Sequence, residues 1–554
     1  MERFIENYTG KKFDLIIIGG GITGAAVAYD AASRGLSVAL VEKQDFGCAT
    51  SSATSKLIHG GLRYLANGEF DIVRESLRER RILSNIAPNL VYPSPVMLTC
   101  YNTHRINSYW NLKIGMILYD LMSFDKGFTW DKSKKIPSHR TISAENAVRL
   151  EPVVRKEGLK GVHIYHDCIS LCPERLTLAF IKSAVRQGAG VSNYAKVEGL
   201  LFSERNVISG VKVKNLLSGE TVEIKGKLVV NCGGPWADKI RGLASDKAGK
   251  NLIVRSEGIH MITGKLTRDH IVTYGKSSKI GFFMLPWRGH TLIGLTDKHY
   301  AGDPDEYKVT RESILELLDT VNEYLGEEKK LKYEDILFTY GGLRPLVGDT
   351  SQDTRKMSRK YEIYDNTDEG IQGIITVEGG KYTTSRNLAE QVMKLVEKKL
   401  KKKPGRCITH KQHLAGCEIN ELPAFLESIK QKNPDIDEKT IDWLGRLYGT
   451  EYHHVIEMAG EDNTLLASIN PDGEILAQVV YALKKEMART LKDIVFRRTG
   501  IGTLGNPGRG LIQKVADIAA EYLGWDEEKK AEEIAGTIQL FTLPDGIDQN
   551  VIEH

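Results

Sequence analysis

Three cations follow glycine pairs in short segments of one style. Arg63 lies in "HGGLRY", Arg344 in "YGGLRP" and Lys381 in "EGGKYTT". A guanidinium offers paired N–H donors in one plane, which suits carboxylates and phosphates, and a lysine adds a compact positive charge. Tyr64 can add a hydroxyl donor. A single arginine is more often a surface or ion-pairing residue, but three cations in one kind of segment predict the binding of an anion.

One histidine is a candidate proton acceptor. His260 lies in "EGIHMITG", which reads as a strand. Its ordinary pKa of about 6.5 suits proton abstraction near neutral pH. The alternative is a structural histidine that donates to a backbone carbonyl, and both readings stay open. Arg344 could also stabilise a negatively charged oxygen, which would lessen the need for a strong base.

The spacing of His, Cys, Asp, Glu and Ser residues does not favour a metal site or a hydrolase. His453 and His454 are adjacent, so on a helix they would point about 100° apart rather than at one ion. We find no cluster with metal-ligand spacing and no Ser–His–Asp order. We therefore predict no metal site.

The elements that must position these residues begin at residue 13. "FDLIIIGGGITGAAVAYDAASRGLSVALVEK" (13–43) reads as a buried strand, a tight turn, an alanine-rich helix ending near Gly35, and a second strand. Gly19 permits the turn, Gly21 lets the backbone approach a pyrophosphate, and Gly24 lets the helix pack on the strand. The N-terminus of this helix then faces the phosphates with free N–H groups.

An acidic residue follows this glycine motif. Glu42 stands at the end of the second strand, where its carboxylate can bind ribose hydroxyls. An acid here disfavours the 2′-phosphate of NADP, but leaves FAD and NAD open. The next segment, "QDFGCATSSATSKLIHGGLRYL" (44–65), is dense in small hydroxyl residues that can bind the phosphate and ring oxygens of a cofactor.

Residues 19–65 carry a resemblance to a known protein family. "GGGITGAAVAYDAASRGLSVALVEKQDFGCATSSATSKLIHGGLRYL" resembles the FAD-dependent glycerol-3-phosphate dehydrogenases, which are flavoproteins related in fold to glycine and D-amino-acid oxidases. Later segments match that family in the same order: "VVNCGGPWAD" (229–238), "GIHMI" (258–262), "TYGGLRPLVGD" (339–349), "SRKYEI" (358–363), "GGKYTTSRNLAE" (379–390) and "RRTGIG" (497–502). The resemblance covers nearly the whole chain.

The resemblance implies a function and a set of residues. It implies oxidation of sn-glycerol 3-phosphate to dihydroxyacetone phosphate, by hydride transfer from C2 to FAD. The catalytic residues would be His260 and Arg344, and the substrate-binding residues Arg63, Tyr64, Arg359 and Lys381. Arg359 lacks a glycine-bearing context and rests on the resemblance alone. His59 competes with His260, although its place in the Ser/Thr-rich loop favours a structural role beside the flavin. The cofactor-binding residues would be Gly19, Gly21, Gly24, Glu42, Lys43, Thr50, Ser51, Ser52, His59, Gly60, Gly61, Gly233, Gly380 and Thr383.

The pattern as a whole predicts an α/β fold with three parts. A discontinuous Rossmann-like FAD-binding domain would comprise 1–90, 150–250 and 340–403. A substrate-binding domain built on an antiparallel sheet would comprise 91–149 and 251–339, because 253–300 alternates apolar and polar residues. A helical C-terminal domain would comprise 404–554, because from about 420 onward the apolar residues recur at helical spacing.

The composition of the chain limits where the protein is found in the cell and what it binds. The net charge of +4, from 76 basic and 72 acidic residues, is too near neutral to indicate a nucleic-acid partner. Seven cysteines without zinc spacing indicate reduced thiols, and no apolar signal core starts the chain, so we expect a cytoplasmic protein. The family adds a peripheral membrane location and, weakly, a homo-oligomer. The oxygen-using oxidases of this family carry a long insertion of about fifty residues, and we find no obvious counterpart in this chain. This favours the dehydrogenase branch of the family, in which a quinone is the electron acceptor.

Two segments bear on membrane contact. "INSYWNLKIGMILYDLMSF" (106–124) is apolar but broken by Lys113 and Asp120, so we expect a core helix rather than a spanning one; Tyr109 and Trp110 could alternatively anchor it at a membrane surface. The basic run 397–413 reads as a solvated linker, with contact to anionic lipid as the alternative.

Two other functions remain in view. A related flavoprotein oxidising an amino acid or a 2-hydroxy acid would need one arginine for its carboxylate, whereas four cations favour a phosphate. A non-catalytic flavin-binding or membrane-surface scaffold would use the basic run and the helical domain, but would not need Arg63, His260, Arg344 and Lys381 together.

Overall fold

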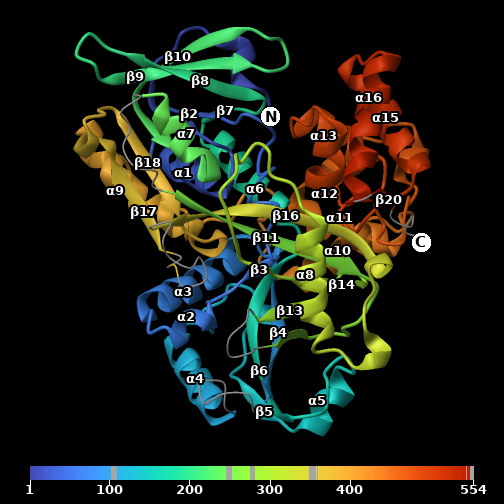
Figure 1. Cartoon of the computed structure of the whole chain (residues 1–554). Coiled ribbons are helices and arrows are strands. Elements are labelled where there is room, and N and C mark those ends of the chain that lie inside the picture. The colour runs from blue at the N-terminus through green and yellow to red at the C-terminus, as the bar shows by residue number, and fades with distance from the viewer. Residues whose placement is uncertain are drawn as a thin grey trace.

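The fold is built on two large sheets and a separate group of helices. The computed structural model describes residues 1–101, 109–244, 253–274, 281–348, 357, 360–544 and 546–548. The first sheet lies at the top of Figure 1 and has the strand order β17-β18-β10-β1-β2-β7, with β9 paired to β10 and β8 to β9. Its strands are β1 (Phe13–Ile18), β2 (Val38–Val41), β7 (Gly190–Ser192), β8 (Ala195–Phe202), β9 (Ile208–Asn215), β10 (Thr221–Asn231), β17 (Tyr361–Asp365) and β18 (Ile374–Gly379).

The centre of the first sheet is parallel and buried on both faces. β1 lies between β2 and β10 and runs parallel to both. Leu15 and Ile17 pack with α1 (Ile22–Ser33), α6 (Pro173–Arg186) and α9 (Ser385–Leu400), whereas Ile16 and Ile18 pack beneath β8 and β9. A β-branched run with both faces covered is typical of a central parallel strand. The predicted strand–turn–helix–strand order of 13–43 is therefore confirmed.

The alanines of α1 explain how two helices reach it. α1 packs against both α6 and α9. Ala25, Ala28 and Ala31 are fully buried in that contact. Small side chains at these positions let neighbouring helix backbones approach closely. The helix therefore keeps a fixed position over the sheet, with its N-terminus at the carboxyl end of β1.

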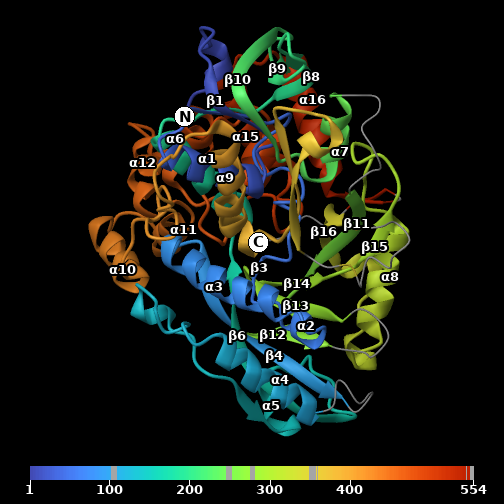
Figure 2. The same cartoon turned by 90° about the vertical axis from the view of Figure 1, so that its left-hand side faces the viewer.

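The second sheet is mostly antiparallel and fills the middle and lower part of the molecule (Figures 1 and 2). Its order is β15-β11-β14-β13-β12-β4-β6-β3, with β16 paired to β11 and β5 to β6. Its one parallel pair among the described residues is β4 with β12. The strands are β3 (Leu57–Ile58), β4 (Val91–Tyr101), β5 (Arg140–Ile142), β6 (Leu159–Ser170), β11 (Ile253–Thr263), β12 (Ile271–Tyr274), β13 (Phe282–Trp287), β14 (His290–Gly294), β15 (Lys298–Tyr300) and β16 (Ile336–Val347).

Strand membership does not follow the predicted ranges everywhere. β3 and β6 lie in ranges that we assigned to the FAD-binding domain, yet they pair in the second sheet. β16 begins within the predicted substrate-binding range and continues past 340 in the same sheet. The chain thus passes between the sheets several times, and the domain boundaries stay a prediction.

The two faces of the second sheet are covered by different helices. Met261, Met284 and Ile293 pack with α8 (Arg311–Asn322) on one face. Ile262 and Leu285, which alternate with them, pack with helices of the C-terminal part on the other face. The predicted antiparallel sheet is therefore the middle layer between α8 and the C-terminal helices.

The C-terminal part is helical, as the apolar spacing predicts. It lies to the right in Figure 1 and packs beside both sheets. A short hairpin of β19 (Thr542–Leu543) and β20 (Ile547–Asp548) follows the last helix. The helices are α10 (Leu422–Lys432), α11 (Glu438–Tyr448), α12 (Tyr452–Glu457), α13 (Ala477–Lys485), α14 (Leu491–Asp493), α15 (Arg509–Leu523) and α16 (Glu527–Ile538).

One predicted core helix lies on the surface instead. The segment 106–124 forms α4 (Tyr109–Met122), of which 106–108 fall outside the described residues. Only Met116 and Tyr119 of the helix are buried, whereas Trp110 and Leu121 are 66% and 67% exposed. The core prediction is wrong because both faces of α4 are apolar, so composition could not tell which face packs inward. None of the helices in the described ranges is long and apolar enough to cross a bilayer.

The remaining helices cover the lower end of the molecule and the edges of the sheets. α4 lies at the opposite end from the β8–β9 hairpin in both views (Figures 1 and 2). α3 contacts α2, α4 and β6. These helices are α2 (Leu62–Ala66), α3 (Phe70–Ile86), α5 (Ala144–Leu150) and α7 (Ala237–Gly242).

Candidate active site

A cavity of about 690 Å³ lies where the two sheets meet. Residues at the carboxyl ends of the parallel strands β1, β2, β10 and β18 line it from one side, and residues of β11 and β16 line it from the other. Ligands of open α/β sheets bind at such carboxyl ends. The predicted site residues that line the cavity are Gly19, Gly21, Glu42, Lys43, Thr50, Ser51, His59, Arg63, Tyr64, Gly233, His260, Arg344, Gly380, Lys381 and Thr383.

The glycine turn fits a bound pyrophosphate. Gly19 has a φ of +107°, and a Cβ there would lie 2.5 Å from the Cys232 carbonyl oxygen. A Cβ on Gly24 would lie 1.9 Å from the Gly19 carbonyl oxygen, so Gly24 permits the contact of helix with turn. Gly21 caps α1 without a side-chain hydrogen bond and lines the cavity. The positive end of the α1 dipole therefore faces an open space, as phosphate binding requires.

Glu42 and Lys43 close the adjoining part of the cavity. The Glu42 carboxylate accepts hydrogen bonds from the N–H groups of Gly20 (2.7 Å) and Gln44 (2.8 Å). Burial raises the pKa of Glu42. Lys43 forms an ion pair with Asp305 and lies 4.1 Å from the centroid of the Trp236 ring. Both residues are thus fixed at the cavity wall where the sequence pattern expects the ribose.

The hydroxyl residues of the following loop mainly brace the wall. Thr50 donates to the carbonyl of Leu343 (2.7 Å), which ties the loop to β16. Ser51 accepts from the N–H of Ile22 at the start of α1 (2.9 Å). Ser52 donates to the Ala49 carbonyl (2.9 Å) and does not line the cavity. Ser52 therefore contacts its own loop rather than the cavity.

The glycine pair at 60 and 61 has a packing role. Neither residue lines the cavity. A Cβ on Gly60 would lie 2.3 Å from Leu77 and from the Tyr119 hydroxyl, and Gly61 has a φ of +76° at the start of α2. The expectation that this pair contacts the cofactor stays a prediction. The pair lets α2 begin tightly against α3 and α4, which aims Arg63 and Tyr64 into the cavity.

Two predicted substrate cations share one aromatic ring. The Lys381 ammonium lies 4.5 Å from the centroid of the Tyr64 ring, and the Arg63 guanidinium carbon lies 5.7 Å from it. Lys381 also donates to the Ser76 hydroxyl (2.6 Å). Burial lowers the pKa of Lys381 to about 8. One part of the cavity is therefore cationic, whereas the fourth predicted cation, Arg359, lies outside the described residues.

His260 is deeply buried in the cavity wall. Its Nε2 lies 3.0 Å from the Ser55 hydroxyl, and its ring stacks on Tyr340 with 4.9 Å between centroids. Nδ1 has no hydrogen-bond partner within the described ranges. Burial, with a smaller effect of the nearby Arg344 and Lys56 charges, lowers the pKa of His260 well below its ordinary value. The imidazole is therefore neutral at pH 7 and able to accept a proton.

Arg344 is held beside this histidine by carbonyl groups. Its guanidinium donates to the carbonyls of Glu257 (3.1 Å) and Thr296 (3.0 Å). A Cβ on Gly258 would lie 1.6 Å from Arg344 Nη2, so only glycine leaves room for the guanidinium. Gly294 does the same for His260, because a Cβ there would lie 2.4 Å from the ring. These two glycines were not identified from the sequence.

His59 lies in the cationic part of the cavity. Burial lowers its pKa to about 4, so it is also neutral at pH 7. Its backbone N–H donates to the Thr383 hydroxyl (3.3 Å). Both histidines line one cavity and both are neutral, so the choice of His260 as base stays a prediction.

Ser55 and Tyr340 are two further residues that sequence reasoning missed. Ser55 touches His260 across 205 positions of the sequence, and the Tyr340 hydroxyl donates to the Thr54 carbonyl (2.8 Å). Both residues belong to segments that the sequence had singled out. No local spacing linked them to His260, because Tyr340 is brought to it by the pairing of β11 with β16, and Ser55 by the loop that reaches β11 from the first sheet.

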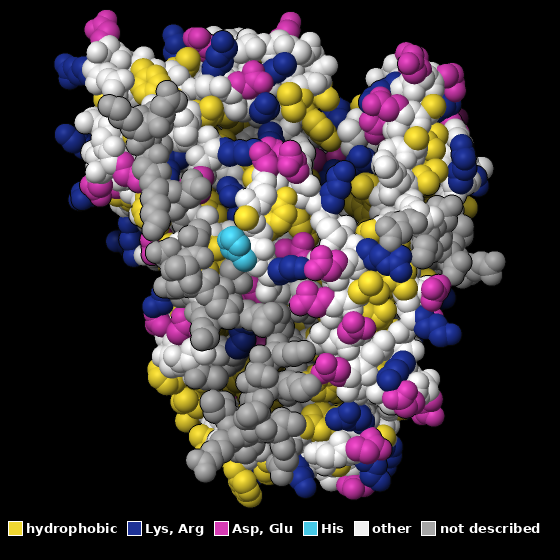
Figure 3. Space-filling model, viewed as in Figure 1, with side chains coloured by type: hydrophobic (Ala, Val, Ile, Leu, Met, Phe, Trp, Pro, Cys, Tyr) yellow, Lys and Arg dark blue, Asp and Glu magenta, His cyan; other side chains and the backbone are white. Residues whose placement is uncertain are grey.

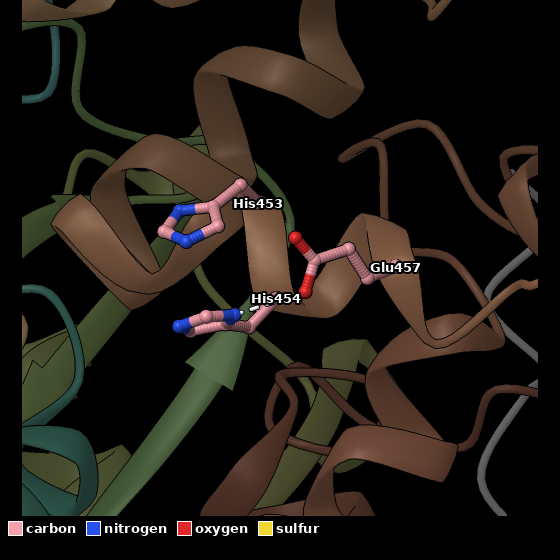
Figure 4. Close-up of side chains that lie close together, drawn as sticks. All are labelled: His453, His454 and Glu457. Atoms are coloured by element: carbon pink, nitrogen blue, oxygen red, sulfur yellow. Dashed lines mark hydrogen bonds and ion pairs between the residues drawn. The ribbon is translucent and has the colours of Figure 1, made fainter.

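The adjacent histidines of the C-terminal part lie closer than expected. The rings of His453 and His454 have centroids 3.9 Å apart, and Glu457 joins them on α12, with one ligand atom of each residue within 4.8 Å of the others (Figure 4). The expectation that the two rings point apart is therefore wrong. All three side chains are exposed and none lines the cavity.

Comparison with known proteins agrees with this geometry. A family model described as FAD dependent oxidoreductase matches residues 14–386, and one described as the C-terminal domain of alpha-glycerophosphate oxidase matches 407–530. A glycerol-3-phosphate dehydrogenase of Synechocystis sp. is 36% identical over 94% of this chain and 95% of its own. An aerobic glycerol-3-phosphate dehydrogenase of Bacillus subtilis is 32% identical over 96% and 94%.

A solved structure extends the agreement to three dimensions. The glycerol-3-phosphate dehydrogenase of Bacillus halodurans, complexed with FAD, has a TM-score of 0.77 and 28% identity, covering 97% of this chain and 96% of its own. Two family models cover most of the sequence in order, and near-full-length relatives exceed 30% identity. This chain therefore belongs to the FAD-dependent oxidoreductases and, among them, to the glycerol-3-phosphate dehydrogenase family.

Proposed function

We propose that this chain oxidises sn-glycerol 3-phosphate to dihydroxyacetone phosphate. The observation that carries the proposal is the placement of Arg63 and Lys381 around one ring of Tyr64, in the same cavity as the neutral imidazole of His260. The Synechocystis and Bacillus relatives are named glycerol-3-phosphate dehydrogenases, which supports the choice of substrate.

The cationic part of the cavity would bind the phosphate. Arg63 offers a planar pair of donors and Lys381 a point charge. Because Lys381 is partly desolvated, its attraction to a dianion is stronger than that of an exposed lysine. Tyr64 holds both cations against one ring and would keep them oriented.

His260 would take the proton of the C2 hydroxyl while the C2 hydride leaves. Bound FAD supplies the acceptor for that hydride. The ring is held by Ser55 and Tyr340, so its orientation is set before the substrate arrives. Arg344 lies near enough to lower the pKa of His260, and its charge would also stabilise the developing alkoxide.

The direct test is reduction of the flavin by the substrate. Purified holoenzyme should lose its oxidised-flavin absorbance when sn-glycerol 3-phosphate is added without oxygen. Glycerol and glycerol 2-phosphate serve as controls, since they lack the phosphate or the C2 hydroxyl. Bleaching by an amino acid or a 2-hydroxy acid, with none by glycerol 3-phosphate, would show that the substrate is wrong.

We further propose a quinone as electron acceptor at a membrane surface, for which α4 is the contact. Trp110, Ile114, Ile117 and Leu121 recur at helical spacing and are all exposed, and Phe124 and Phe128 continue beyond the helix with 71% and 69% exposure. Figure 3 shows hydrophobic side chains along the lower left edge, where α4 lies in Figure 1. An exposed apolar stripe of this size is unusual for a surface in contact only with water.

Cations stand beside this apolar stripe. Lys113 lies 5.2 Å from the Trp110 ring centroid, and Arg74 lies 4.3 Å from that of Phe124. Aromatic rings flanked by basic side chains suit the boundary between anionic headgroups and acyl chains. These contacts favour a lipid surface over a second protein as the occupant.

Vesicle binding tests the surface. Wild-type protein should co-sediment with vesicles containing phosphatidylglycerol, and Leu121→Ser should weaken binding about tenfold by removing one inserted apolar side chain. Leu217→Ser is the matched control, because Leu217 is an exposed leucine in another part of the fold. Equal binding of both variants would contradict the assignment.

Reoxidation of the reduced enzyme by a quinone analogue, compared with reoxidation by oxygen, tests the electron acceptor. The homo-oligomer implied by the family is measured by light scattering.

A further inference from the structure

Two arginines of the C-terminal part bind one buried carboxylate in the wall of the FAD cavity. Asp45 is fully buried in the loop after β2. Arg498 grips it with two parallel hydrogen bonds, Nη1 to Oδ2 (2.8 Å) and Nη2 to Oδ1 (2.7 Å). Arg497 adds Nε to Oδ2 (2.7 Å), and Asn193 adds Nδ2 to Oδ1 (3.0 Å). Two arginines from more than 450 residues away thus fix one residue of the cofactor loop.

The loop that contains Asp45 is interlocked with the glycine turn. Glu42, Lys43, Gln44, Gly47 and Cys48 line the cavity on either side of it, whereas Asp45 does not. The Gly47 N–H donates to the Gly20 carbonyl (3.0 Å), and the Gly20 N–H donates to the Glu42 carboxylate (2.7 Å). A displacement of Asp45 would therefore shift both the ribose side and the pyrophosphate side of the cavity.

The two arginines are themselves rigidly held. They end a π-helical turn, Ile494–Arg498, which is a rare conformation that often marks a functional position. Arg498 Nε donates to the Glu486 carbonyl (3.0 Å), and Arg497 pairs with Asp493 (2.5 Å). The Thr499 N–H closes the turn on the Ile494 carbonyl (3.0 Å). Consecutive arginines are thereby aimed at one carboxylate, and their position depends on the C-terminal helices.

Because Asp45 is fully buried, its position depends on these hydrogen-bond donors. A buried carboxylate is stable only while its partners are present, because burial strongly disfavours an unpaired charge. The two guanidinium groups hold the pKa of Asp45 low, at about 2, against the opposing effect of burial. Loss of either arginine leaves the carboxylate short of donors, and the loop can restore them only by moving toward water or toward other groups.

We propose that Arg497 and Arg498 are positioning residues for FAD, and that through Asp45 they hold the loop 42–48 in the shape that retains the cofactor. FAD retention is then coupled to the docking of the C-terminal part. The inference rests on FAD binding by this chain but on no particular substrate, so its failure and the failure of the proposed function are distinguishable.

The experiment measures FAD binding without turnover. Arg498→Met apoprotein is titrated with FAD, following the quenching of flavin fluorescence, and FAD release from diluted holoenzyme is timed. Loss of a residue that orients ligand-contacting groups typically costs about 10–100-fold in affinity at metal sites, and we expect the same order here for the dissociation constant of FAD. The activity per bound flavin and the KM for glycerol 3-phosphate should stay within about twofold, because neither arginine touches the cavity.

A matched variant separates positioning from general stability. Arg288 is equally buried and pairs with Asp472 and Glu474 across the contact between the second sheet and the C-terminal part. Arg288→Met should lower the Tm of the apoprotein as Arg498→Met does, yet leave the dissociation constant of FAD unchanged. Arg498→Lys should recover part of the FAD affinity.

The outcomes decide the proposal. An unchanged dissociation constant in Arg498→Met, or an equal rise in Arg288→Met, would overturn it. If Arg498→Met does not fold, Asp45→Asn and Arg497→Gln replace it, because each removes one charge and keeps hydrogen-bonding atoms. Tighter or equal FAD binding in both of these would overturn the proposal as well.

Discussion

Lys381→Met is the substitution that tests the anion site most directly. The Lys381 ammonium is partly buried beside Tyr64 and lines the cavity. Its hydrogen-bond partner, Ser76, also donates to the Ile72 carbonyl (2.7 Å), so the substitution leaves no buried hydroxyl without a partner. Methionine keeps the length and most of the volume of the side chain. The variant therefore removes one charge and little else.

The magnitude follows from the interaction of two charges near a protein surface. At about 4 Å and an effective dielectric constant near 20, a unit pair is worth about 4 kcal/mol. Arg63 remains and water takes part of the vacated space, so we expect a loss of about 3 kcal/mol. Since 1.4 kcal/mol is a factor of ten, kcat/KM should fall about 100-fold, mostly through KM.

The pH dependence gives a second, independent reading. Burial lowers the pKa of Lys381 to about 8, so the free enzyme loses this charge as pH rises through 8. Wild-type kcat/KM should therefore decline above pH 8, and the decline should vanish in Lys381→Met. Lys381→Arg should retain the charge and move the decline to higher pH, because a guanidinium does not deprotonate in this range.

The control is a second lysine in the wall of the same cavity. Lys239 lines the cavity but pairs with Asp303 (2.6 Å) and Asp305 (2.9 Å). Because its charge is already neutralised and exposed, Lys239→Met should change KM by about threefold or less. An equal effect of the two variants, or a decline above pH 8 that persists in Lys381→Met, would refute the assignment of Lys381 to the phosphate.

Three further predictions follow from buried groups. His260→Gln should lower kcat about 10²–10³-fold with little change in KM, measured by steady-state kinetics. Gly258→Ala should lower kcat/KM about 100-fold, because the added Cβ would displace the Arg344 guanidinium, and a crystal structure of the variant would show the shift. Burial raises the pKa of Glu378 to about 8, far above its unfolded value, so the stability that its neutral form contributes is complete below about pH 4 and is lost as pH rises through 8. Glu378→Gln should therefore raise Tm relative to wild type by an amount that grows from pH 5 to 8 and then stays constant, and a Tm gain independent of pH would contradict this.

Local chemistry made part of the site predictable from the sequence. The strand at 13–18 and the turn with its glycines at 19, 21 and 24 are determined by residues that are close together in the sequence. Their conformation can therefore be predicted from the order of those residues. The glycine-bearing style of the Arg63 and Lys381 segments likewise predicted two cations that the fold brings to one ring. Each of these features depends on neighbours in the chain.

Features that depend on distant pairing were not predictable. Ser55 reaches His260 only because β11 and β16 lie beside the Ser/Thr-rich loop. The role of Gly258 and Gly294 follows only from the fold, because the side chains of Arg344 and His260 fill the space beside them. The exposure of α4 was misjudged for a related reason. Apolar residues on both of its faces give no sign of which face meets the core.

The low pKa of His260 constrains how the proposed reaction can proceed. Burial and the charges of Arg344 and Lys56 all disfavour the imidazolium form. A full proton transfer to His260 before hydride departure would therefore be costly. The same two charges favour a negative oxygen on the substrate, so they lower the pKa of the C2 hydroxyl as they lower that of the histidine. What governs the reaction is the difference between these two pKa values, which the shared charges change little. Proton and hydride should therefore leave together, since the electron pair on the oxygen then forms the carbonyl as the proton departs. No free alkoxide builds up, and the positive charge that His260 gains is matched by the negative charge that the hydride carries to its acceptor.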